Sequence, residues 1–269
     1  MKEPTNRLKV YYQNVRGLRT KINELFVAAY DRYYDVIVMT ETWLNDQIHS
    51  TQLFGSNYTV YRNDRDPAIS GKKRGGGVLI AVSTRLVSRK IDIIGYHLEQ
   101  LWVTLSGENR EICIGVIYIS PELADDPNLF EQHIESLLTV STKLKPHDFL
   151  LMFGDYNQPG LIWKKSPRGH AYPDPVDSTF SSASSTLLDG IALMDMKQMT
   201  VVPNKRNRTL DLLFVNDDAV TNCHVSEAYD PLVDVDSHHP PLSTEVCCPQ
   251  QMHFIELPED REFNFSKAH

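Results

Sequence analysis

Polar side chains that could bind a metal ion or transfer a proton follow the ends of short apolar segments in this sequence. Asp155 and Asn157 come after the apolar stretch 150–153, and Glu41 follows the stretch 36–40. Because strand ends at one edge of a sheet can converge on one cleft, we expect these side chains to lie together. The complete set is Asn14, Glu41, Tyr118, Asp155, Asn157, Asp211, Asp236, His238 and His239.

These are the residue types that cleavage of a phosphodiester requires. The charge on the non-bridging oxygens must be neutralised, a water molecule must lose a proton, and the leaving oxygen must be stabilised. A hard divalent ion held by oxygen ligands such as Glu41 and Asn14 performs the first and third tasks. Asp155 could activate the water, and a histidine with an aspartate partner supplies acid–base capacity or a cation for the phosphate.

Each of these residues has a more ordinary interpretation when it is taken alone. A single Asn after a strand is usually a turn residue, a carboxylate such as Glu41 often begins a helix, and Tyr118 is typical of packing. Asp211 is less ordinary, because a carboxylate inside an apolar run must be exposed on one face or paired. The ordered co-occurrence of the whole set favours a catalytic site.

Short apolar, β-branched segments predict buried strands beside most of these polar residues. The predicted strands are 8–13, 36–40, 77–82, 101–105, 112–118, 149–153, 201–202, 210–215 and 242–246. Apolar residues at helical spacing predict helices at 19–33, 128–144 and 182–194, the last capped near Ser184 or Ser185. The excess of strands favours two sheets packed face to face with helices outside, and 164–185 predicts a long surface loop.

Length and composition are those of one folded unit with an acidic balance. The chain has 269 residues and a formal net charge of −8, which taken alone argues against nonspecific binding to polyanions. We expect residues 1–246 to form one domain and residues 247–269 to be a tail or linker. No apolar run is long enough to span a membrane, we expect no secretory signal, and the four cysteines suit a reducing intracellular compartment.

Seven motifs, in this order, resemble those of the endonuclease/exonuclease/phosphatase superfamily. They are QNVRGL at 13–18, TETWL at 40–44, RGGGV at 74–78, VIYISP at 116–121, GDYN at 154–157, TLDLLF at 209–214 and SHHPPL at 237–242. Within the superfamily, NVRGL and ETWL are most similar to the apurinic-type endonuclease domain of non-long-terminal-repeat retrotransposons. The resemblance covers residues 9–246, and FNFSKA at 263–268 resembles the linker to their reverse transcriptase.

The resemblance implies an α/β fold, a four-layer sandwich of two packed mixed β-sheets flanked by helices, like that of DNase I. It also implies an Mg²⁺- or Mn²⁺-dependent endonuclease that nicks double-stranded DNA, so that the new 3′-hydroxyl primes reverse transcription. The partner would be a reverse transcriptase domain of the same polyprotein. The target would be chromosomal DNA in the nucleus, after synthesis of the protein in the cytoplasm.

The same resemblance implies a role for each residue of the set. Glu41 and Asn14 would bind the metal ion, and Tyr118 would contact the scissile phosphate. Asp155, assisted by Asn157, would orient or deprotonate the attacking water.

The histidine motif departs from the family's pattern, which is Ser-Asp-His, one further residue, and then Pro and an aliphatic residue. In one register His239 takes the catalytic position, and His238 replaces an aspartate that normally helps to bind metal. The other register makes His238 the catalytic residue. We prefer His239, which Asp211 would hold in one tautomer, because the following Pro-Leu then keeps its place. Asp236 could substitute as a ligand; otherwise weak metal affinity, a preference for Mn²⁺ or reduced activity would follow.

Basic residues in loops that border the predicted cleft, and one before the glycine triplet, are candidates for phosphate contacts, which position a duplex without reading its sequence. They are Arg74, Lys164, Lys165, Lys205, Arg206 and Arg208. Basic clusters of this kind are also typical of solvated loops. Two other functions stay open: a phosphatase, because the fold does not fix the substrate, and a catalytically impaired domain that only binds DNA or protein.

Overall fold

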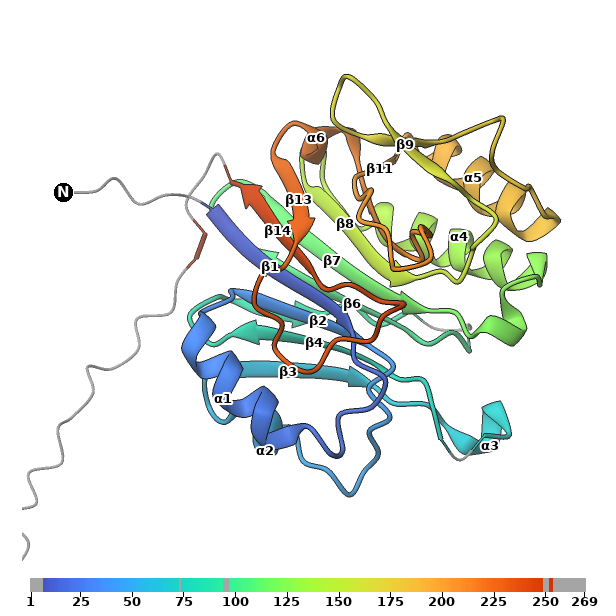
Figure 1. The fold of residues 1–269 in the computed structure, drawn as a ribbon. Helices are drawn as coiled ribbons and strands as arrows, with labels where there is room; N and C mark the ends of the chain where they lie inside the picture. Colours follow the sequence, from blue (N-terminus) through green and yellow to red (C-terminus); the bar gives the residue numbers. More distant parts are fainter. Residues whose placement is uncertain (1–6, 73, 94–96, 249–251, 254–269) are drawn as a thin grey trace, which may run out of the picture.

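Two β-sheets packed face to face form the centre of the structure (Figure 1). The computed structural model describes residues 7–72, 74–93, 97–248 and 252–253. One apolar cluster lies between the sheets, and one lies between each sheet and the helices outside it. The predicted four-layer α/β sandwich is therefore confirmed. Within the described ranges, no helix is long and apolar enough to cross a membrane.

The first sheet has six strands in the order β13-β14-β1-β2-β4-β3. Its strands are β1 (Arg7–Asn14), β2 (Val36–Thr40), β3 (Tyr58–Asn63), β4 (Val78–Ser83), β13 (Cys223–Glu227) and β14 (Leu242–Cys247). β1 and β2 run parallel, and the other pairs in this sheet are antiparallel. The parallel register sets Asn14 beside Thr40, so both strands end at the same edge of the sheet.

The second sheet has eight strands in the order β5-β6-β7-β8-β12-β11-β10-β9. Its strands are β5 (Ser88–Lys90), β6 (Gln100–Ser106), β7 (Glu111–Tyr118), β8 (Phe149–Asp155), β9 (Trp163–Lys165), β10 (Ala171–Pro173), β11 (Lys197–Gln198) and β12 (Asp211–Val215). β8 is buried along its whole length, because the first sheet covers one of its faces and helices cover the other. Burial on both faces explains its uninterrupted apolar sequence.

Helices cover the outer faces of both sheets (Figure 1). The helices are α1 (Ile22–Arg32), α2 (Thr51–Phe54), α3 (Pro67–Ser70), η1 (Pro121–Leu123), α4 (Pro127–Ser141), α5 (Ser182–Leu193) and α6 (Asp217–Val220). Helix α5 is capped by Ser181, whose side chain accepts from the Ser184 N–H at 3.1 Å while the Ser184 hydroxyl accepts from the Ser181 N–H at 2.8 Å. The N-cap residue predicted at Ser184 or Ser185 was wrong. The N-cap is Ser181, and Ser184 is the third helical residue, whose side chain completes the capping box.

The strands that were not predicted lie at or near the edges of the sheets. β3, β5, β9, β10 and β13 are partly exposed and contain polar residues, so they lack the apolar runs that identify buried strands. β9 and β10 form a hairpin inside the segment predicted to be a surface loop. The strand predicted at 201–202 was wrong, since the strand that pairs with β12 is β11 at 197–198.

Part of the predicted tail hydrogen-bonds to the domain. Cys247 is the last residue of β14, and the backbone N–H of His253 donates to the Ser106 carbonyl at 3.0 Å. The Val87 N–H in turn donates to the His253 carbonyl at 3.3 Å, and Met252 forms a bridge with Gly107. Residues 249–251 and 254–269, which include the stretch that resembles a linker, lie outside the described residues.

Candidate active site

Strand register places three of the predicted side chains next to one another in the second sheet. Asp155 ends β8, and its partners on the neighbouring strands are Tyr118, at the end of β7, and Asp211, at the start of β12. Directly paired residues of neighbouring strands project to the same face of a sheet. Asp155 and Asp211 are buried, with exposed fractions of 0% and 3%. Two carboxylates therefore lie side by side away from solvent.

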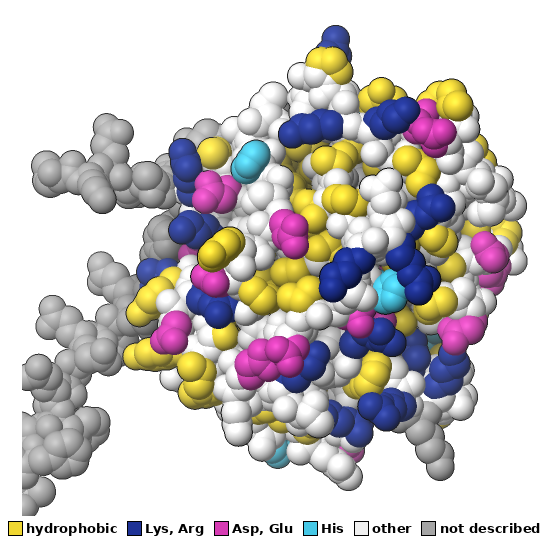
Figure 2. Space-filling view, in the orientation of Figure 1, with side chains coloured by type: hydrophobic (Ala, Val, Ile, Leu, Met, Phe, Trp, Pro, Cys, Tyr) yellow, Lys and Arg dark blue, Asp and Glu magenta, His cyan; other side chains and the backbone are white. Residues whose placement is uncertain are grey.

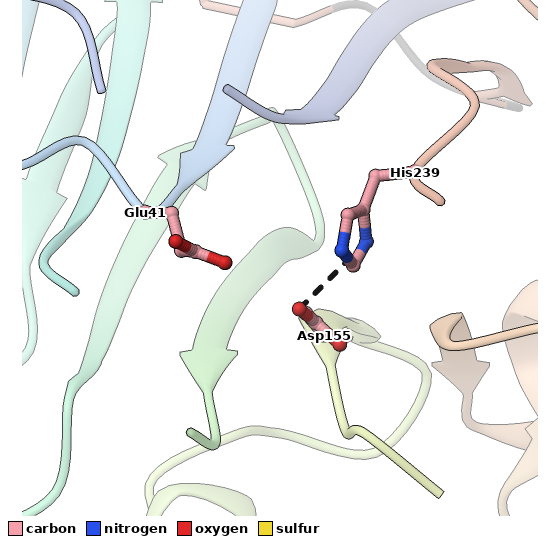
Figure 3. A group of neighbouring side chains, drawn as sticks. All are labelled: Glu41, Asp155 and His239. Atoms are coloured by element: carbon pink, nitrogen blue, oxygen red, sulfur yellow. Dashed lines mark ion pairs between the residues drawn. The ribbon is translucent and has the colours of Figure 1, made fainter. Parts of the chain in front are cut away.

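The loop before β14 brings His239 onto these two aspartates. The Nδ1 atom of His239 lies 2.9 Å from Oδ2 of Asp211. It lies 3.8 Å from Oδ2 of Asp155, the pair joined by the dashed line in Figure 3. The shorter distance makes Asp211 the hydrogen-bond partner, so Nδ1 carries a proton. Of the two registers considered for the histidine motif, the structure has the one in which His239 joins the aspartates. His238 is only partly buried, and its ring centroid lies 6.5 Å from that of His239.

The first sheet supplies Glu41 and Asn14. Glu41 has a φ of 52°, a left-handed conformation that is uncommon in non-glycine residues, and its carboxylate lies near Asp155 and His239 (Figure 3). The Asn14 Nδ2 donates to Glu41 Oε1 at 3.0 Å and to Asp155 Oδ2 at 2.9 Å, which links the two sheets. Asn14 Oδ1 accepts from the Arg16 N–H at 3.2 Å. The nitrogen of the Asn14 amide therefore faces the carboxylates of Glu41 and Asp155. For its oxygen to bind a metal ion there, as predicted, the amide group would have to rotate by half a turn.

Glu41, Asp155 and His239 form a group that could hold a metal ion. Their ligand atoms all lie within 4.8 Å of one another. The group is acidic, because three carboxylates, counting Asp211, face one imidazole. When all three carboxylates are ionised and His239 is protonated, two negative charges are unbalanced. Carboxylate oxygens are the ligands that hard divalent cations prefer, and a divalent charge would balance this excess. The residues present therefore fit a divalent cation.

Burial and neighbouring charges shift the protonation of this group. Burial, reinforced by the carboxylate of Asp211, raises the pKa of Asp155 to about 8. Burial alone would lower the pKa of His239, but the adjacent carboxylates, Asp211 above all, outweigh it and raise that pKa to about 10. At neutral pH and without a bound cation the imidazole is therefore protonated and cannot be a ligand, so the carboxylates of Glu41 and Asp155 are the groups that would hold a cation. The negative form of Asp155 in turn needs a nearby cation to be stable.

Asp236 lies outside this group and shapes the loop that carries the histidines. Its Oδ2 forms an ion pair with Arg16 at 2.8 Å, and its Oδ1 accepts from the His238 N–H at 2.8 Å. Its carbonyl accepts from the His239 N–H at 3.1 Å. Burial would raise the pKa of Asp236, but the His238 N–H and Arg16 lower it. The predicted role of Asp236 as a replacement metal ligand is therefore not seen in this arrangement, because its carboxylate is already engaged.

We expect Asp236→Ala to lower the free energy of unfolding by about 1–2 kcal/mol, because a capped backbone N–H and an ion pair are lost. Affinity for Mn²⁺ should stay within about twofold of the parent value, because the ligand group is unchanged. Chemical denaturation and Mn²⁺ titration monitored by electron paramagnetic resonance measure the two quantities. Asp234→Ala, at an exposed carboxylate of the same loop, is the control. A tenfold loss of Mn²⁺ affinity in Asp236→Ala alone would identify Asp236 as a ligand.

Tyr118 and Asn157 lie beside Asp155. Burial raises the pKa of Tyr118, so its hydroxyl is a neutral hydrogen-bond donor, and the Arg65 guanidinium lies 5.7 Å from its ring centroid. Asn157 has a φ of 46°; its backbone N–H donates to Asp155 Oδ1 at 3.2 Å and its Nδ2 donates to the Ile119 carbonyl at 2.8 Å. In this structure Asn157 fixes the turn after β8 and with it the Asp155 carboxylate.

Two residues that contact the site were not predicted from the sequence. The hydroxyl of Tyr12 donates to Asp211 Oδ1 at 2.8 Å, and the Nε1 of Trp43 donates to Glu41 Oε2 at 3.1 Å. Tyr12 lies two positions before the site residue that ends β1, so strand alternation could have indicated it. The position of Trp43 depends on a tertiary contact, because its ring packs on Gly17, where a Cβ would lie 2.5 Å from a ring carbon.

Three of the predicted phosphate-binding residues lie on a loop beside the histidine loop. Lys205, Arg206 and Arg208 are exposed. Asn204, which is buried, holds this loop: its Oδ1 accepts from the backbone N–H groups of Arg206 and Arg208 at 2.9 and 3.1 Å, and its Nδ2 donates to the His238 carbonyl at 3.1 Å. Figure 2 shows Lys and Arg side chains gathered on the side of the molecule where β1 and β2 end. The exposed side chains of the loop thus place positive charge beside the histidine loop.

The other predicted basic residues are placed differently. The Arg74 guanidinium lies 4.6 Å from the ring centroid of Trp43, the residue that donates to the Glu41 carboxylate. Lys164, on β9, forms an ion pair with the buried carboxylate of Asp174, which would compete with a phosphate. Lys165 is exposed on the same strand. Arg74 therefore stays close to the site, whereas Lys164 serves first to hold the hairpin.

A profile of the Endonuclease/Exonuclease/phosphatase family matches residues 12–234. The chain belongs to this family. The match includes Asn14, Glu41, Tyr118, Asp155 and Asp211 and ends before the histidine loop, the part that departs from the expected pattern. No curated protein sequence matches the chain.

Several solved structures share the fold. The endonuclease domain of TRAS1, a telomere-specific non-LTR retrotransposon, superposes with a TM-score of 0.62 at 16% identity, covering 90% of this chain and 100% of that one. The AP endonuclease LMAP from Leishmania major gives 0.68 at 15% identity, covering 92% and 90%. The 3′-5′ exonuclease NExo from Neisseria meningitidis gives 0.60 at 14% identity, covering 90% and 100%. At identities this low, the structural similarity establishes the fold only. The substrate has to be inferred from the site itself.

Proposed function

We propose that this protein is a metal-dependent endonuclease that nicks double-stranded DNA and leaves a 3′-hydroxyl end. The observation that carries the proposal is the group of partly buried Glu41 with buried Asp155 and His239, in which Asp211 fixes the histidine. It combines ligands for a divalent ion, a base for water and a cation for phosphate within one small site. An exposed basic loop lies directly beside it.

In this proposal each side chain has one task at the scissile phosphate. A divalent ion, when bound, supplies charge neutralisation on the phosphate oxygens and stabilisation of the leaving oxygen. Asp155 orients the attacking water and takes its proton. Protonated His239, held by Asp211 through Nδ1, donates to the phosphate from Nε2. Tyr118 adds a neutral donor beside Asp155, and Glu41 anchors the ion.

The choice of DNA as substrate rests on the basic loop and on the retrotransposon-like motifs. Lys205, Arg206 and Arg208 would contact backbone phosphates, which position a duplex without reading its sequence. The likeness to the TRAS1 endonuclease domain supports the further proposal that the nick primes reverse transcription. In that role the protein would act on chromosomal DNA in the nucleus, with a reverse transcriptase domain of the same polyprotein.

A phosphatase is the second candidate, because one structural neighbour is described as the 3′ phosphatase NExo from Neisseria bound to a product DNA hairpin. That structure gives a TM-score of 0.57 at 15% identity, covering 89% of this chain and 99% of that one. The same acidic site could remove a terminal phosphate, since the fold does not fix the substrate. The two candidates differ in product, which an assay can separate.

Incubation with supercoiled plasmid in Mg²⁺, Mn²⁺ or EDTA tests the proposal. We expect open circles with a divalent ion and none with EDTA, and extension of the nick by a DNA polymerase would show a 3′-hydroxyl. Release of inorganic phosphate from a 3′-phosphorylated oligonucleotide, without nicking, would favour the phosphatase. DNA binding without either product would indicate a domain that only binds.

Charge reversal in the basic loop should weaken DNA binding. We expect Lys205→Glu with Arg206→Glu to lower affinity about tenfold or more and to reduce the slope of log K against log salt by about 1.8, at about 0.9 per phosphate contact. Fluorescence anisotropy over a series of salt concentrations measures both.

The matched control reverses two adjacent charges elsewhere. Arg89 and Lys90 lie on the edge strand β5, and their ion pairs are to Glu111 and Asp92 rather than to any site residue. Arg89→Glu with Lys90→Glu changes the net charge equally and should leave the salt slope unchanged. Equal weakening by both double variants would remove the basic loop from the DNA interface.

A further inference from the structure

The side chain of Tyr12 extends from the first sheet to the second beneath the candidate site. It belongs to β1 of the first sheet and is fully buried, with an exposed fraction of 0%. Its hydroxyl donates to Oδ1 of Asp211, on β12 of the second sheet, at 2.8 Å. The ring stacks on that of Phe153, with centroids 5.8 Å apart and planes 14° apart. The hydroxyl is therefore held at a fixed point under Asp211.

The hydrogen-bond roles around this hydroxyl follow from the number of protons. A phenol has one proton, and a carboxylate can only accept, so the Tyr12 proton goes to Asp211. The Thr40 Oγ1, 3.2 Å from the Tyr12 oxygen, is therefore the donor in that contact. The proton of the Tyr12 hydroxyl is thereby used within the protein. Because the side chain is fully buried, it is out of reach of substrate.

Asp211 is held at both of its oxygens. Tyr12 occupies Oδ1, and the Nδ1–H of His239 occupies Oδ2 at 2.9 Å. A carboxylate fixed at both ends cannot rotate away from the imidazole. The orientation of His239, and the use of Nε2 for substrate, therefore depend on the contact that Tyr12 makes.

The same face of β1 also fixes the second aspartate. Asn14 lies two residues after Tyr12, so both side chains project from one face, and its Nδ2 donates to Asp155 Oδ2 at 2.9 Å. Asp155 and Asp211 are direct neighbours in the β8–β12 ladder, and His239 Nδ1 lies within 3.8 Å of both. Each aspartate thus has its own donor from β1. The two donors give the adjacent carboxylates different hydrogen-bond partners. Without them, Asp155 and Asp211 would compete for the Nδ1 proton of His239.

We propose that Tyr12 is a positioning residue for phosphodiester cleavage, which binds Asp211 so that this aspartate orients His239, while Asp155, held by Asn14 and Asn157, acts on water. The inference rests on the proposed endonuclease function for its kinetic test. It assigns Tyr12 no contact with DNA or metal. Its effect passes through one hydrogen bond, which a single-atom change removes.

Tyr12→Phe removes only the hydroxyl oxygen and keeps the ring in the core. We expect kcat for plasmid nicking to fall by about tenfold to a hundredfold, as for other residues that orient a catalytic or ligand histidine. KM for DNA should stay within about twofold. Tyr11→Phe is the matched control: the neighbouring tyrosine is also fully buried, but its hydroxyl serves Gln13 and the Leu232 N–H on the other face of β1. Equal losses of kcat in both variants would overturn the proposal.

Nuclear magnetic resonance of ¹⁵N-histidine-labelled protein provides a test that needs no catalysis. The parent and Tyr11→Phe should show His239 protonated at Nδ1 with a slowly exchanging proton, and Tyr12→Phe should exchange that proton at least about tenfold faster. If the parent does not nick DNA, the proposed function fails while this measurement still decides the role of Tyr12. If Tyr12→Phe does not fold, a slowly exchanging hydroxyl proton of Tyr12 in the parent supports the proposal, and its absence overturns it.

Discussion

Asp155→Asn is expected to lower the rate of plasmid nicking by about a thousandfold or more while DNA binding is retained. Asn keeps the size of the side chain and can still accept from the Asn14 Nδ2, but it can neither take a proton from water nor offer a charged ligand. The change also removes one of the carboxylates that make this group acidic. Single-turnover nicking with excess enzyme, together with fluorescence anisotropy, separates catalysis from binding.

The same variant should be more stable than the parent when no metal is present. Because burial and Asp211 raise the pKa of Asp155 to about 8, the charged form is disfavoured in the folded state. The folded pKa lies above the unfolded one, so stability is lost as pH rises between about 4 and 8, and an uncharged Asn avoids that loss. At pH 8 we expect a gain on the order of 2 kcal/mol in the free energy of unfolding. Lost activity with gained stability would exclude misfolding as the cause.

Asp148→Asn is the control for this experiment. Asp148 is a buried aspartate that precedes the other end of β8, where it accepts from the backbone N–H groups of Glu111 and Lys145, both at 2.7 Å. The Asp148→Asn variant should nick plasmid at the rate of the parent protein. Nicking by Asp155→Asn at a rate within tenfold of the parent would show that another group activates the water.

The central strands of the fold could be predicted because a strand that is buried on both faces has an uninterrupted run of apolar residues. β2, β7 and β8 are apolar along nearly their whole length, and their predicted bounds are within two residues of the observed ones. The edge strands lack such apolar runs. β3, with the sequence YTVYRN, is mostly only partly buried, and β9, with the sequence WKK, has two exposed lysines, so neither differs from a loop in hydrophobicity alone.

The sequence named most of the residues that the structure brings together at the candidate site, but it gave neither their contacts nor the contributions of Tyr12 and Trp43. Asp211 was an acid in an apolar strand, and that anomaly correctly indicated a paired carboxylate; the register then set it beside Asp155. The sequence does not record that Arg16 engages Asp236, since these residues are far apart in the chain and meet only through the fold. The direction of the Asn14 amide depends likewise on Glu41 and Asp155, which lie far from Asn14 in the sequence.

His239→Ala is expected to lower nicking by about a thousandfold, because in the proposed mechanism the imidazole supplies a cation for the phosphate and balances Asp155 and Asp211. Its removal leaves those two adjacent carboxylates without their common partner. The metal-free variant should therefore also unfold more readily as pH rises above the range in which the aspartates are protonated. Single-turnover rates and urea denaturation at several pH values measure the two effects.

His238→Ala is the matched control and also tests the register of the histidine motif. His238 is partly buried, and its hydrogen bonds in the loop are made by the backbone, from its N–H to Asp236 and from Asn204 to its carbonyl, so alanine preserves them. We expect its nicking rate to stay within about threefold of the parent. The reverse result, with His238 essential and His239 dispensable, would mean that the working protein uses the other register. Because the two residues are adjacent and share one loop, a general disturbance of that loop would affect both variants alike, whereas the buried contact of His239 with Asp211 predicts that they differ by more than a hundredfold.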